Sequence, residues 1–369
     1  MDQLLIGFLG LSWKHFVMFG IGFLLIYLAI AKEYEPVLLL PIGFGALLCN
    51  IPFSSAVGPE GPLTILHHAG IVTELFPCLI FVAVGAMCDF SPMLKNPVLM
   101  LFGAAAQFGI FATIIFAACL GFNINEAASI GIIGAADGPT TIYVATKLAP
   151  DLLAPLSVAA YSYMSLVPII QPPVIKALTT KKERSLLMPV KEDIPVSRMV
   201  KILFPIVVTL VAGIIAPISV ALVGMLMFGN LIKECGVVER LSRASQEELA
   251  NLVTLLLGIT IGATMTAEQF LNVKTIMVIG MGIVAFVFDT AGGVLFAKGL
   301  NLLLKEKINP MIGACGISAF PMSARVIAKM ALAENKRNYI IMHAVGANVS
   351  GQLGSIIAGG LVLAIVVGI

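Results

Sequence analysis

The chain has 369 residues, of which 59% are hydrophobic and only 11% are charged, and its mean hydropathy is +1.04. An average soluble domain carries roughly 25% charged residues, so this composition excludes an ordinary soluble protein. It predicts an all-α polytopic membrane protein with about nine to eleven spans of roughly 20 residues each. The net charge of +2 gives no sign of a nucleic-acid partner, and the six cysteines include no CxxC pair that would indicate a metal or redox site.

Residues 1–178 form the predicted N-terminal membrane half. Its least regular part is a broken segment at 126–149, where Gly138 and Pro139 interrupt an apolar run. Neither residue continues a regular helix well, so the backbone is expected to break there. The apolar runs that predict the other spans of this half cover 16–31, 36–51, 70–87, 97–120 and 152–178.

The most polar stretch of the chain, 179–201, separates the two halves. By the positive-inside rule it is predicted to be a cytoplasmic loop, because short loops rich in Lys and Arg stay on that side of the membrane. Residues 202–369 form the predicted C-terminal membrane half, with a second Gly- and Pro-interrupted segment at 310–331. The basic residues of the loop are Lys181, Lys182, Arg184, Lys191, Arg198 and Lys201.

The two interrupted segments resemble each other. IGIIGAADGPTTIYVATKLA at 130–149 aligns without a gap with IGACGISAFPMSARVIAKMA at 312–331. Interrupted helices in corresponding positions of two halves are typical of transporters, whose site lies near the bilayer midplane between repeats. We therefore predict two repeats, in the inverted arrangement, whose interrupted helices meet near the midplane. The strongest matches are a proline and a lysine: Pro139 with Pro321 and Lys147 with Lys329.

Asp137 is the most unusual residue of the first interrupted segment. A carboxylate at the centre of a membrane helix costs about 2.5–3.5 kcal/mol on insertion scales, and irregular backbone at that depth needs protein or a watery cavity around it. Asp137 is therefore predicted to mark an ion site. Of the other carboxylates near apolar runs, Asp89 and Glu74 fit structural roles, as a helix cap and a solvent-facing group, and Asp289 stays open between structure and function.

The second interrupted segment has no carboxylate but offers Ser318, Ser323 and Arg325. Arg325 suits either of two roles, holding an anion through two hydrogen bonds or extending from a helix end towards the interface. GANVSGQLGS at 346–355 and YSYMSLVPIIQPP at 161–173 add hydroxyl, amide and carbonyl oxygens. With one carboxylate, these are the ligands that a hard cation such as Na⁺ prefers. The alternative for 346–355 is a small-residue helix contact.

With GAADGPTTIY and NVSGQLGS, the chain resembles the β subunit of the sodium-translocating carboxybiotin decarboxylases. These are the membrane subunits of oxaloacetate, methylmalonyl-CoA, glutaconyl-CoA and malonate decarboxylase pumps. The resemblance covers essentially the whole chain and implies that carboxybiotin is decarboxylated here while a proton is consumed and Na⁺ is driven outward. The compact chain, without long loops, is more similar to the acyl-CoA decarboxylase pumps than to the longer oxaloacetate-type subunits.

The resemblance also implies residue roles and partners. The essential, sodium-coupled aspartate of the family falls on Asp137, and a tyrosine implicated in proton delivery falls on Tyr163. The residues of the second motif fall on Asn348, Gly351 and Ser355 and complete the expected sodium site. The implied partners are a biotin carrier subunit, a carboxyltransferase subunit and a small single-span membrane subunit, assembled as a multimer in a bacterial inner membrane.

The carboxybiotin carboxylate is expected at the N-terminus of a half-helix, where backbone N–H groups favour an anion. We assign Gly138, Thr140, Ser323 and Arg325 to this site. The main alternative is a sodium-coupled secondary transporter of a small anion, which shares the broken repeats and differs in being independent of biotin. An intramembrane aspartyl protease would need a second aspartate that shares a proton, and Asp289 is the candidate for that role.

Overall fold

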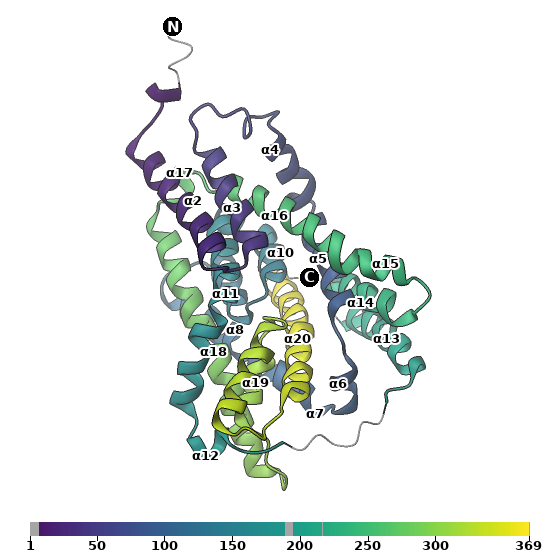
Figure 1. Ribbon diagram of the computed structural model, residues 1–369. Helices are drawn as coiled ribbons and strands as arrows, with labels where there is room; N and C mark the ends of the chain where they lie inside the picture. The colour runs from purple at the N-terminus through teal and green to yellow at the C-terminus, as the bar shows by residue number, and fades with distance from the viewer. Residues whose placement is uncertain (1–6, 189–194, 216, 369) are drawn as a thin grey trace.

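The computed structural model describes residues 7–188, 195–215 and 217–368, and every regular element in these ranges is a helix (Figure 1). The predicted all-α membrane class is therefore confirmed. Six helices are long and apolar enough to cross a membrane, and two bent pairs, Pro62–Val72 with Leu75–Met87 and Pro150–Met164 with Leu166–Leu178, raise the number to eight. The six are α2 (Trp13–Ala31), α7 with α8 (Val98–Cys119), α13 (Arg198–Ile215), η4 with α14 (Pro217–Cys235), α18 (Val273–Leu303) and α20 (Ile341–Val367).

Two further apolar helices are too short to count as spans by length. α3 (Pro36–Cys49) and α16 (Ala250–Ala263) have 14 residues each, fewer than the roughly 17–25 residues of a full crossing. The described residues therefore contain six to eight helices of spanning length, and the nine to eleven spans stay a prediction. Shorter elements connect the long helices: α4 (Pro62–Leu66), η1 (His67–Val72), α6 (Ser91–Lys95), η3 (Pro150–Leu152), α12 (Lys181–Arg184), α15 (Glu239–Ala244), η5 (Ser245–Leu249) and α17 (Ala267–Phe270).

Six helices form a row, the panel, that runs from upper left to right in Figure 1. Its order is α2, α3, α16, α5 (Leu75–Met87), α14 (Val220–Cys235) and α13, and each helix packs on the next. α3, from the first half of the sequence, packs on α16 from the second, and α14, from the second half, packs on α5 from the first. The two halves of the sequence are therefore interleaved in space.

Glycines allow both of these exchanged helix pairs to approach closely. A Cβ atom at Gly262 of α16 would collide with the carbonyl group of Ile42 in α3, and one at Gly229 of α14 would collide with that of Val82 in α5. Close approach through small residues is a common way for membrane helices to associate, because lipid gives no hydrophobic drive for helix contact. Close contact at a glycine therefore stabilises both the α3–α16 pair and the α5–α14 pair of the panel.

The remaining long helices form a second group, the bundle, which contains α7 (Val98–Ala106), α8 (Phe108–Cys119), α11 (Leu153–Leu178), α18 and α20. α11 and α18 pack together and run in the same direction. At one level the hydroxyl group of Tyr163 donates to the carbonyl oxygen of Ile279. At the ends of both helices, the Lys298 ammonium donates to the carbonyl oxygen of Leu178 at 3.0 Å.

The first interrupted segment is a helical hairpin. α9 (Ile124–Ile132) and η2 (Ile133–Ala135) form one leg, and α10 (Gly138–Leu148) forms the other. The chain reverses at Ala136, which has a left-handed backbone (φ 52°), and at the extended Asp137. The base of the hairpin is fixed by two ion pairs, Glu126 with Lys274 at 2.7 Å and Lys147 with Glu74 at 2.6 Å.

The second interrupted segment is also a hairpin, built from η6 (Pro310–Gly316) and α19 (Met322–Glu334). Both legs end beside α12, which follows α11. The amide group of Asn309 donates to the carbonyl oxygen of Arg184 at 2.8 Å, and the guanidinium group of Arg184 pairs with Glu334 at 2.7 Å. This hairpin therefore starts from the end of α11, whereas the first hairpin leads into the beginning of α11.

The tips of the two hairpins meet inside the bundle, where the backbone N–H of Ser318 donates to the carbonyl oxygen of Ala135 at 2.8 Å. The expected interruptions are thus present, and in each the second leg returns towards the end from which the first leg came. Two hairpins that enter from opposite ends, together with the exchanged pairs of the panel, support the inverted repeat. That repeat stays a prediction.

Candidate functional site

Asp137 caps the second leg of the first hairpin. Its Oδ1 accepts a hydrogen bond from the backbone N–H of Thr140 at 3.2 Å, and Pro139 lies in the first turn of α10, where a missing N–H costs little. The N-terminus of a helix favours a negative charge, because its first N–H groups have no partner within the helix. Only 3% of the Asp137 surface is exposed, so the carboxylate depends on these protein donors.

Two side chains of α20 complete the contacts of this carboxylate. The hydroxyl group of Ser355 donates to Asp137 Oδ2 at 2.6 Å, and the amide group of Gln352 donates to the same atom at 3.2 Å. The structure thus brings together Asp137 and Ser355, two residues of the predicted sodium site. Gln352 was not assigned to that site, although its spacing of three residues from Ser355 places both on one face of a helix.

Two other residues predicted to bind sodium contact the second hairpin. The amide group of Asn348 donates to the carbonyl oxygens of Cys315, at 3.2 Å, and Ile317, at 2.7 Å. Gly351 accepts a hydrogen bond from the hydroxyl group of Ser318 at 3.0 Å. Asn348 and Ser355 are seven residues apart, which is about 10 Å along a helix. α20 therefore contacts the first hairpin tip through Ser355 and the second through Asn348.

Two buried oxygen atoms near the hairpin tips have no hydrogen-bond donor within the described part of the chain. They are Oγ1 of Thr140, on the first hairpin, and Oδ1 of Asn348, which faces the second. A buried polar atom without a partner costs free energy. Both atoms are neutral oxygen ligands of the kind that hard cations accept, so the donor set fits a cation such as Na⁺.

The four residues expected to bind carboxybiotin lie on two different hairpins. Gly138 and Thr140 belong to α10, and the ring of Tyr161 lies so close to Gly138 that a side chain there would collide with it. Ser323 and Arg325 belong to α19, where Ser323 is fully buried and Arg325 is exposed. The hydroxyl group of Ser323 already contacts Gln171 Oε1 at 3.0 Å and the carbonyl oxygen of Ala314 at 3.2 Å.

The two tyrosines of α11 take different positions. The hydroxyl group of Tyr163 donates to the carbonyl oxygen of Ile279 in α18, and its ring packs on Gly282. The ring of Tyr161, by contrast, covers Gly138, the residue next to Asp137. The sequence predicts a role in proton delivery for Tyr163 and gives Tyr161 no role beyond that of a polar residue of 161–173. Residues two apart on a helix point to different sides, so the sequence does indicate that Tyr161 and Tyr163 face different neighbours.

Three other carboxylates, Glu74, Asp89 and Asp289, lie in or next to apolar helices. Glu74 pairs with Lys147, and Asp89 Oδ1 accepts the backbone N–H of Ser91 at 2.9 Å, as a capping residue does. Asp289 is fully buried in α18 against the backbone of Gly109 in α8. Within the described residues, no group of three or more His, Cys, Asp or Glu side chains is placed to hold a metal ion.

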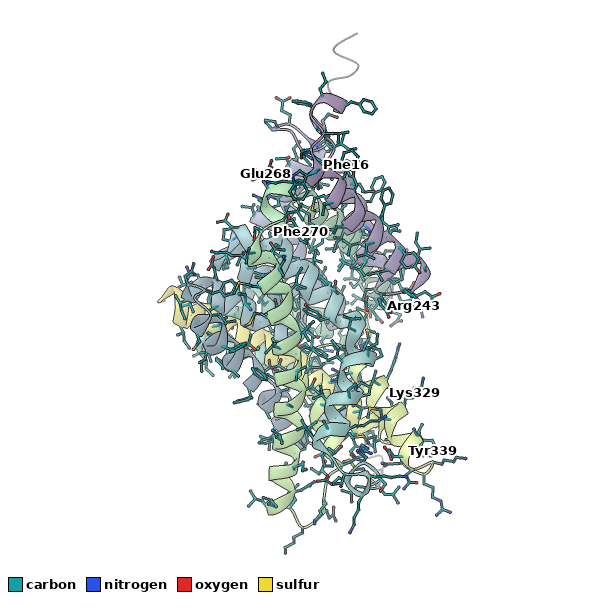
Figure 2. The ribbon with its side chains drawn as sticks, turned by 90° about the vertical axis from the view of Figure 1, so that its left-hand side faces the viewer. Phe16, Arg243, Glu268, Phe270, Lys329 and Tyr339 are labelled. Atoms are coloured by element: carbon teal, nitrogen blue, oxygen red, sulfur yellow. The ribbon has the colours of Figure 1, made fainter. Side chains whose placement is uncertain are left out.

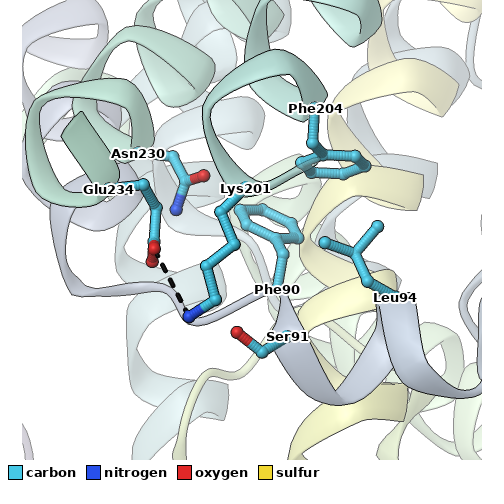
Figure 3. A pocket seen from close by; sticks show the side chains of 7 residues that line it. All are labelled: Phe90, Ser91, Leu94, Lys201, Phe204, Asn230 and Glu234. Atoms are coloured by element: carbon cyan, nitrogen blue, oxygen red, sulfur yellow. Dashed lines mark ion pairs between the residues drawn. The ribbon is translucent and has the colours of Figure 1, made fainter. Parts of the chain in front are cut away.

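The loop that carries Asp89 joins the bundle to the panel. Burial acts to raise the pKa of Asp89, but the hydrogen bonds from Ser91 and the charges of Lys233 and Lys201 outweigh it, so the pKa lies below the usual range. Figure 3 shows the hollow beside this loop, in which Lys201 Nζ lies 3.5 Å from a carboxylate oxygen of Glu234. These contacts give the loop a structural role.

Fold and site together define a polytopic membrane protein with a buried carboxylate between two opposed helical hairpins. The family model of the Na⁺-transporting oxaloacetate decarboxylase beta subunit matches residues 14–366. The methylmalonyl-CoA decarboxylase subunit beta of Veillonella parvula is 51% identical over 358 residues, which cover 97% of this chain and 95% of that protein. The glutaconyl-CoA decarboxylase subunit beta of Acidaminococcus fermentans is 48% identical over 362 residues, 98% of this chain and 96% of that protein.

The oxaloacetate decarboxylase beta chain 2 of Salmonella typhi is 43% identical over an aligned length of 418 positions, and the alignment covers 97% of this chain and 96% of that protein. The chain therefore belongs to the family of Na⁺-transporting oxaloacetate decarboxylase beta subunits. The resemblance inferred from its two motifs is confirmed, and so is its class as the membrane subunit of a decarboxylase sodium pump.

Proposed function

We propose that this subunit decarboxylates carboxybiotin on a partner carrier subunit and uses that reaction to export Na⁺. The observation that carries the proposal is the buried Asp137 carboxylate, held by Ser355 and Gln352 where two opposed hairpins meet. The chain belongs to the family of Na⁺-transporting oxaloacetate decarboxylase beta subunits, which supports this activity. A buried carboxylate in a membrane protein is costly and is by default a functional group.

Asp137 is the proposed anionic ligand of Na⁺. Ser355 and the unpaired Thr140 Oγ1 are neutral oxygens on the same side of the hairpin contact. Asn348 and Gly351 of α20 contact the second hairpin and complete the proposed set, and Asn348 Oδ1 is unpaired within the described residues. Because these ligands come from the first hairpin and from α20, movement of the first hairpin tip relative to α20 would change the number of ligands around the ion.

The chemical step breaks the N–CO₂ bond of carboxybiotin, releases CO₂, and leaves the electron pair on a ureido nitrogen that takes up a proton. Tyr163 is the proposed proton donor. The ring of Tyr161 packs on Gly138, the residue next to Asp137. The carboxylate of the substrate is proposed to bind between Gly138 and Thr140 of α10 and Ser323 and Arg325 of α19. The exposed Arg325 supplies the positive charge of this set.

The decarboxylation has to bias the access of the ion site. Moving one Na⁺ outward against 100 mV costs about 2.3 kcal/mol, so the two access states must differ by at least this amount per ion. The two hairpins start from opposite ends of α11, with bases at Lys274 and Arg184 respectively. Each hairpin is therefore suited to limit access from one side of the membrane.

The proposed partner subunits, assembly and membrane location of the pump are based on the resemblance to this family. We propose that the chain works with a biotin carrier subunit, a carboxyltransferase subunit and a small single-span membrane subunit, as a multimer in a bacterial inner membrane with residues 179–201 in the cytoplasm. The methylmalonyl-CoA and glutaconyl-CoA relatives are 51%, 49% and 48% identical, and the oxaloacetate relatives are 41–43% identical. These identities support an acyl-CoA as the upstream substrate.

The test is the variant Asp137→Asn in the reconstituted complex. It keeps the size of the side chain and removes the charge, so we expect loss of both Na⁺-stimulated carboxybiotin decarboxylation and uptake of radioactive Na⁺. Asp151→Asn is the matched control, since Asp151 is an exposed carboxylate just after α10. If Asp137→Asn keeps both activities, the sodium assignment is wrong. If avidin leaves Na⁺ transport by the wild-type complex unchanged, the coupling to biotin is wrong.

A further inference from the structure

Three segments that are distant in the sequence form one surface at the end of the molecule where α11 stops. They are 176–188, 298–309 and 329–340, and together we call them the basic platform. Lys329 and Tyr339 mark this end in Figure 2, and Glu268 and Phe270 mark the opposite end. The platform includes α12, the end of α18 and the end of α19.

The platform is built around the backbone of the residues after α12. Asn309 donates to the carbonyl oxygen of Leu186 at 3.0 Å, Asn338 donates to the same oxygen at 2.8 Å, and Asn335 donates to that of Ser185 at 3.3 Å. Asn309 is fully buried and Asn338 is 1% exposed. Buried amides that join three separate segments give this surface a fixed shape.

The charges of the platform are strongly unequal. Its two partly buried carboxylates are already paired, Glu183 with Lys298 at 3.2 Å and Glu334 with Arg184 at 2.7 Å. Glu306 is the exposed acidic residue of the three segments. The exposed cations of the platform that form no ion pair within the described residues are Lys176, Lys181, Lys182, Lys305, Lys307, Lys329, Lys336 and Arg337.

The base of the first hairpin differs in this respect. There, Lys147 pairs with Glu74 and Lys274 pairs with Glu126, so that each of these cations is neutralised by a partner. The positive-inside rule accounts for the sign of the charge on the platform. It does not require the rigid connection of three loops through buried asparagines, which suggests a surface that recognises a partner.

The position of the platform fits a protein partner. α18 has 31 residues, which is about 46 Å of helix, longer than the roughly 30 Å hydrocarbon core of a bilayer. Both legs of the second hairpin end at the platform, through Asn309 and Glu334. A carrier that delivers its substrate to that hairpin therefore has to approach across this surface.

We propose that the basic platform docks an acidic face of the biotin carrier subunit and so positions its carboxylated group over the second hairpin. This inference rests on the proposed function. Complementary charge of this kind raises the rate of encounter by about 10- to 1,000-fold at low salt, and salt reduces the effect because exposed charges are screened.

The test uses the full-length chain in phosphatidylcholine nanodiscs with the carboxylated carrier subunit. Two charge reversals, Lys181→Glu/Lys182→Glu and Lys336→Glu/Arg337→Glu, are compared with Arg240→Glu/Arg243→Glu. The control reverses two exposed cations on α15, away from the platform (Figures 1 and 2). Carrier binding, carrier-dependent turnover and turnover of free carboxybiotin are measured at fixed Na⁺ and at low and high KCl.

We expect each platform variant to raise the Kd and the apparent KM for the carrier about tenfold at low KCl. The difference should shrink at high KCl, and turnover of free carboxybiotin and the control variant should stay near wild type. An unchanged carrier Kd in the platform variants overturns the docking site, and so does an equal shift in the control. Loss of binding to phosphatidylglycerol vesicles with an unchanged carrier Kd would also overturn it, in favour of lipid.

Failure of the proposed function gives a different result. In that case the wild-type chain does not decarboxylate free carboxybiotin in a Na⁺-dependent way. The salt-sensitive binding of the carrier still decides whether the platform is its docking surface, because binding is measured without turnover.

Discussion

Replacing Ser355 with alanine is a direct test of the ion site, because it removes a single hydrogen bond to the carboxylate of Asp137. The Ser355 hydroxyl group donates to Asp137 Oδ2 at 2.6 Å, and both side chains are buried. A hydrogen bond to a charged group contributes about 1.5–3 kcal/mol, and about 1.4 kcal/mol corresponds to a factor of ten. We therefore expect the Na⁺ concentration for half-maximal activity to rise about 10- to 150-fold.

The direction follows from the charge state of the site. A bound cation requires the Asp137 carboxylate to be ionised. The Ser355 hydroxyl group stabilises this state, either by donating a hydrogen bond to the carboxylate or by binding the cation through its oxygen. The assay is carboxybiotin turnover as a function of Na⁺ in proteoliposomes, together with the initial uptake of radioactive Na⁺. We expect the maximal rate at saturating Na⁺ to fall less than the apparent affinity.

Ser350→Ala is the matched control, because Ser350 is also a buried serine of α20. Its hydroxyl group contacts the carbonyl oxygens of Leu99 at 2.8 Å and Ala347 at 2.7 Å, and neither contact involves Asp137. Half-saturation by Na⁺ should stay near wild type in this variant. An unchanged Na⁺ dependence in Ser355→Ala, or an equal shift in Ser350→Ala, would refute the argument that Ser355 holds the ion-binding carboxylate.

Two further predictions concern the tyrosines of α11 and the loop at Asp89. Tyr163→Phe should lower carboxybiotin turnover more than Tyr161→Phe, because it removes the hydroxyl group that is proposed to deliver the proton and that donates to the carbonyl oxygen of Ile279; rates of both variants across a pH series decide this, and a larger loss in Tyr161→Phe contradicts it. Asp89→Asn should lower the melting temperature near neutral pH, because the native pKa of Asp89 lies below its usual value. That loss should disappear as the pH falls below about 3.9 and through the lowered pKa, where the native carboxylate is also protonated. A pH-independent difference in melting temperature would exclude this charge effect.

Several features of the molecule could be predicted from the residues alone. The apolar composition fixed the membrane class, because so many hydrophobic residues cannot be buried in a soluble fold of this size. The breaks at Gly138 and Pro139 and the cost of a carboxylate among apolar residues marked Asp137. Both rest on local physical chemistry, namely backbone preference and desolvation, which are properties of a residue and its nearest neighbours.

The two motifs also gave the family, which the comparisons then established. The pairing of Asp137 with Ser355 followed from the same resemblance, and the structure places the two residues in contact at 2.6 Å. The proposed roles of Tyr163, Arg325 and Asn348 stay predictions. Their positions on α11, α19 and α20 now allow each role to be tested separately.

The tertiary structure decided which long-range neighbours each polar residue has. It added Gln352 to the contacts of Asp137, placed Tyr161 over Gly138, and directed Asn348 to the second hairpin instead of the first. It also decided that each interrupted segment turns back on itself. A break in a helix permits continuation in any direction, and the direction observed here comes with contacts to distant segments, among them the ion pairs at the hairpin bases. Composition and local backbone preference thus determined the membrane class and the place of the carboxylate, whereas contacts between distant segments determined its surroundings, because such contacts depend on packing that no local pattern contains.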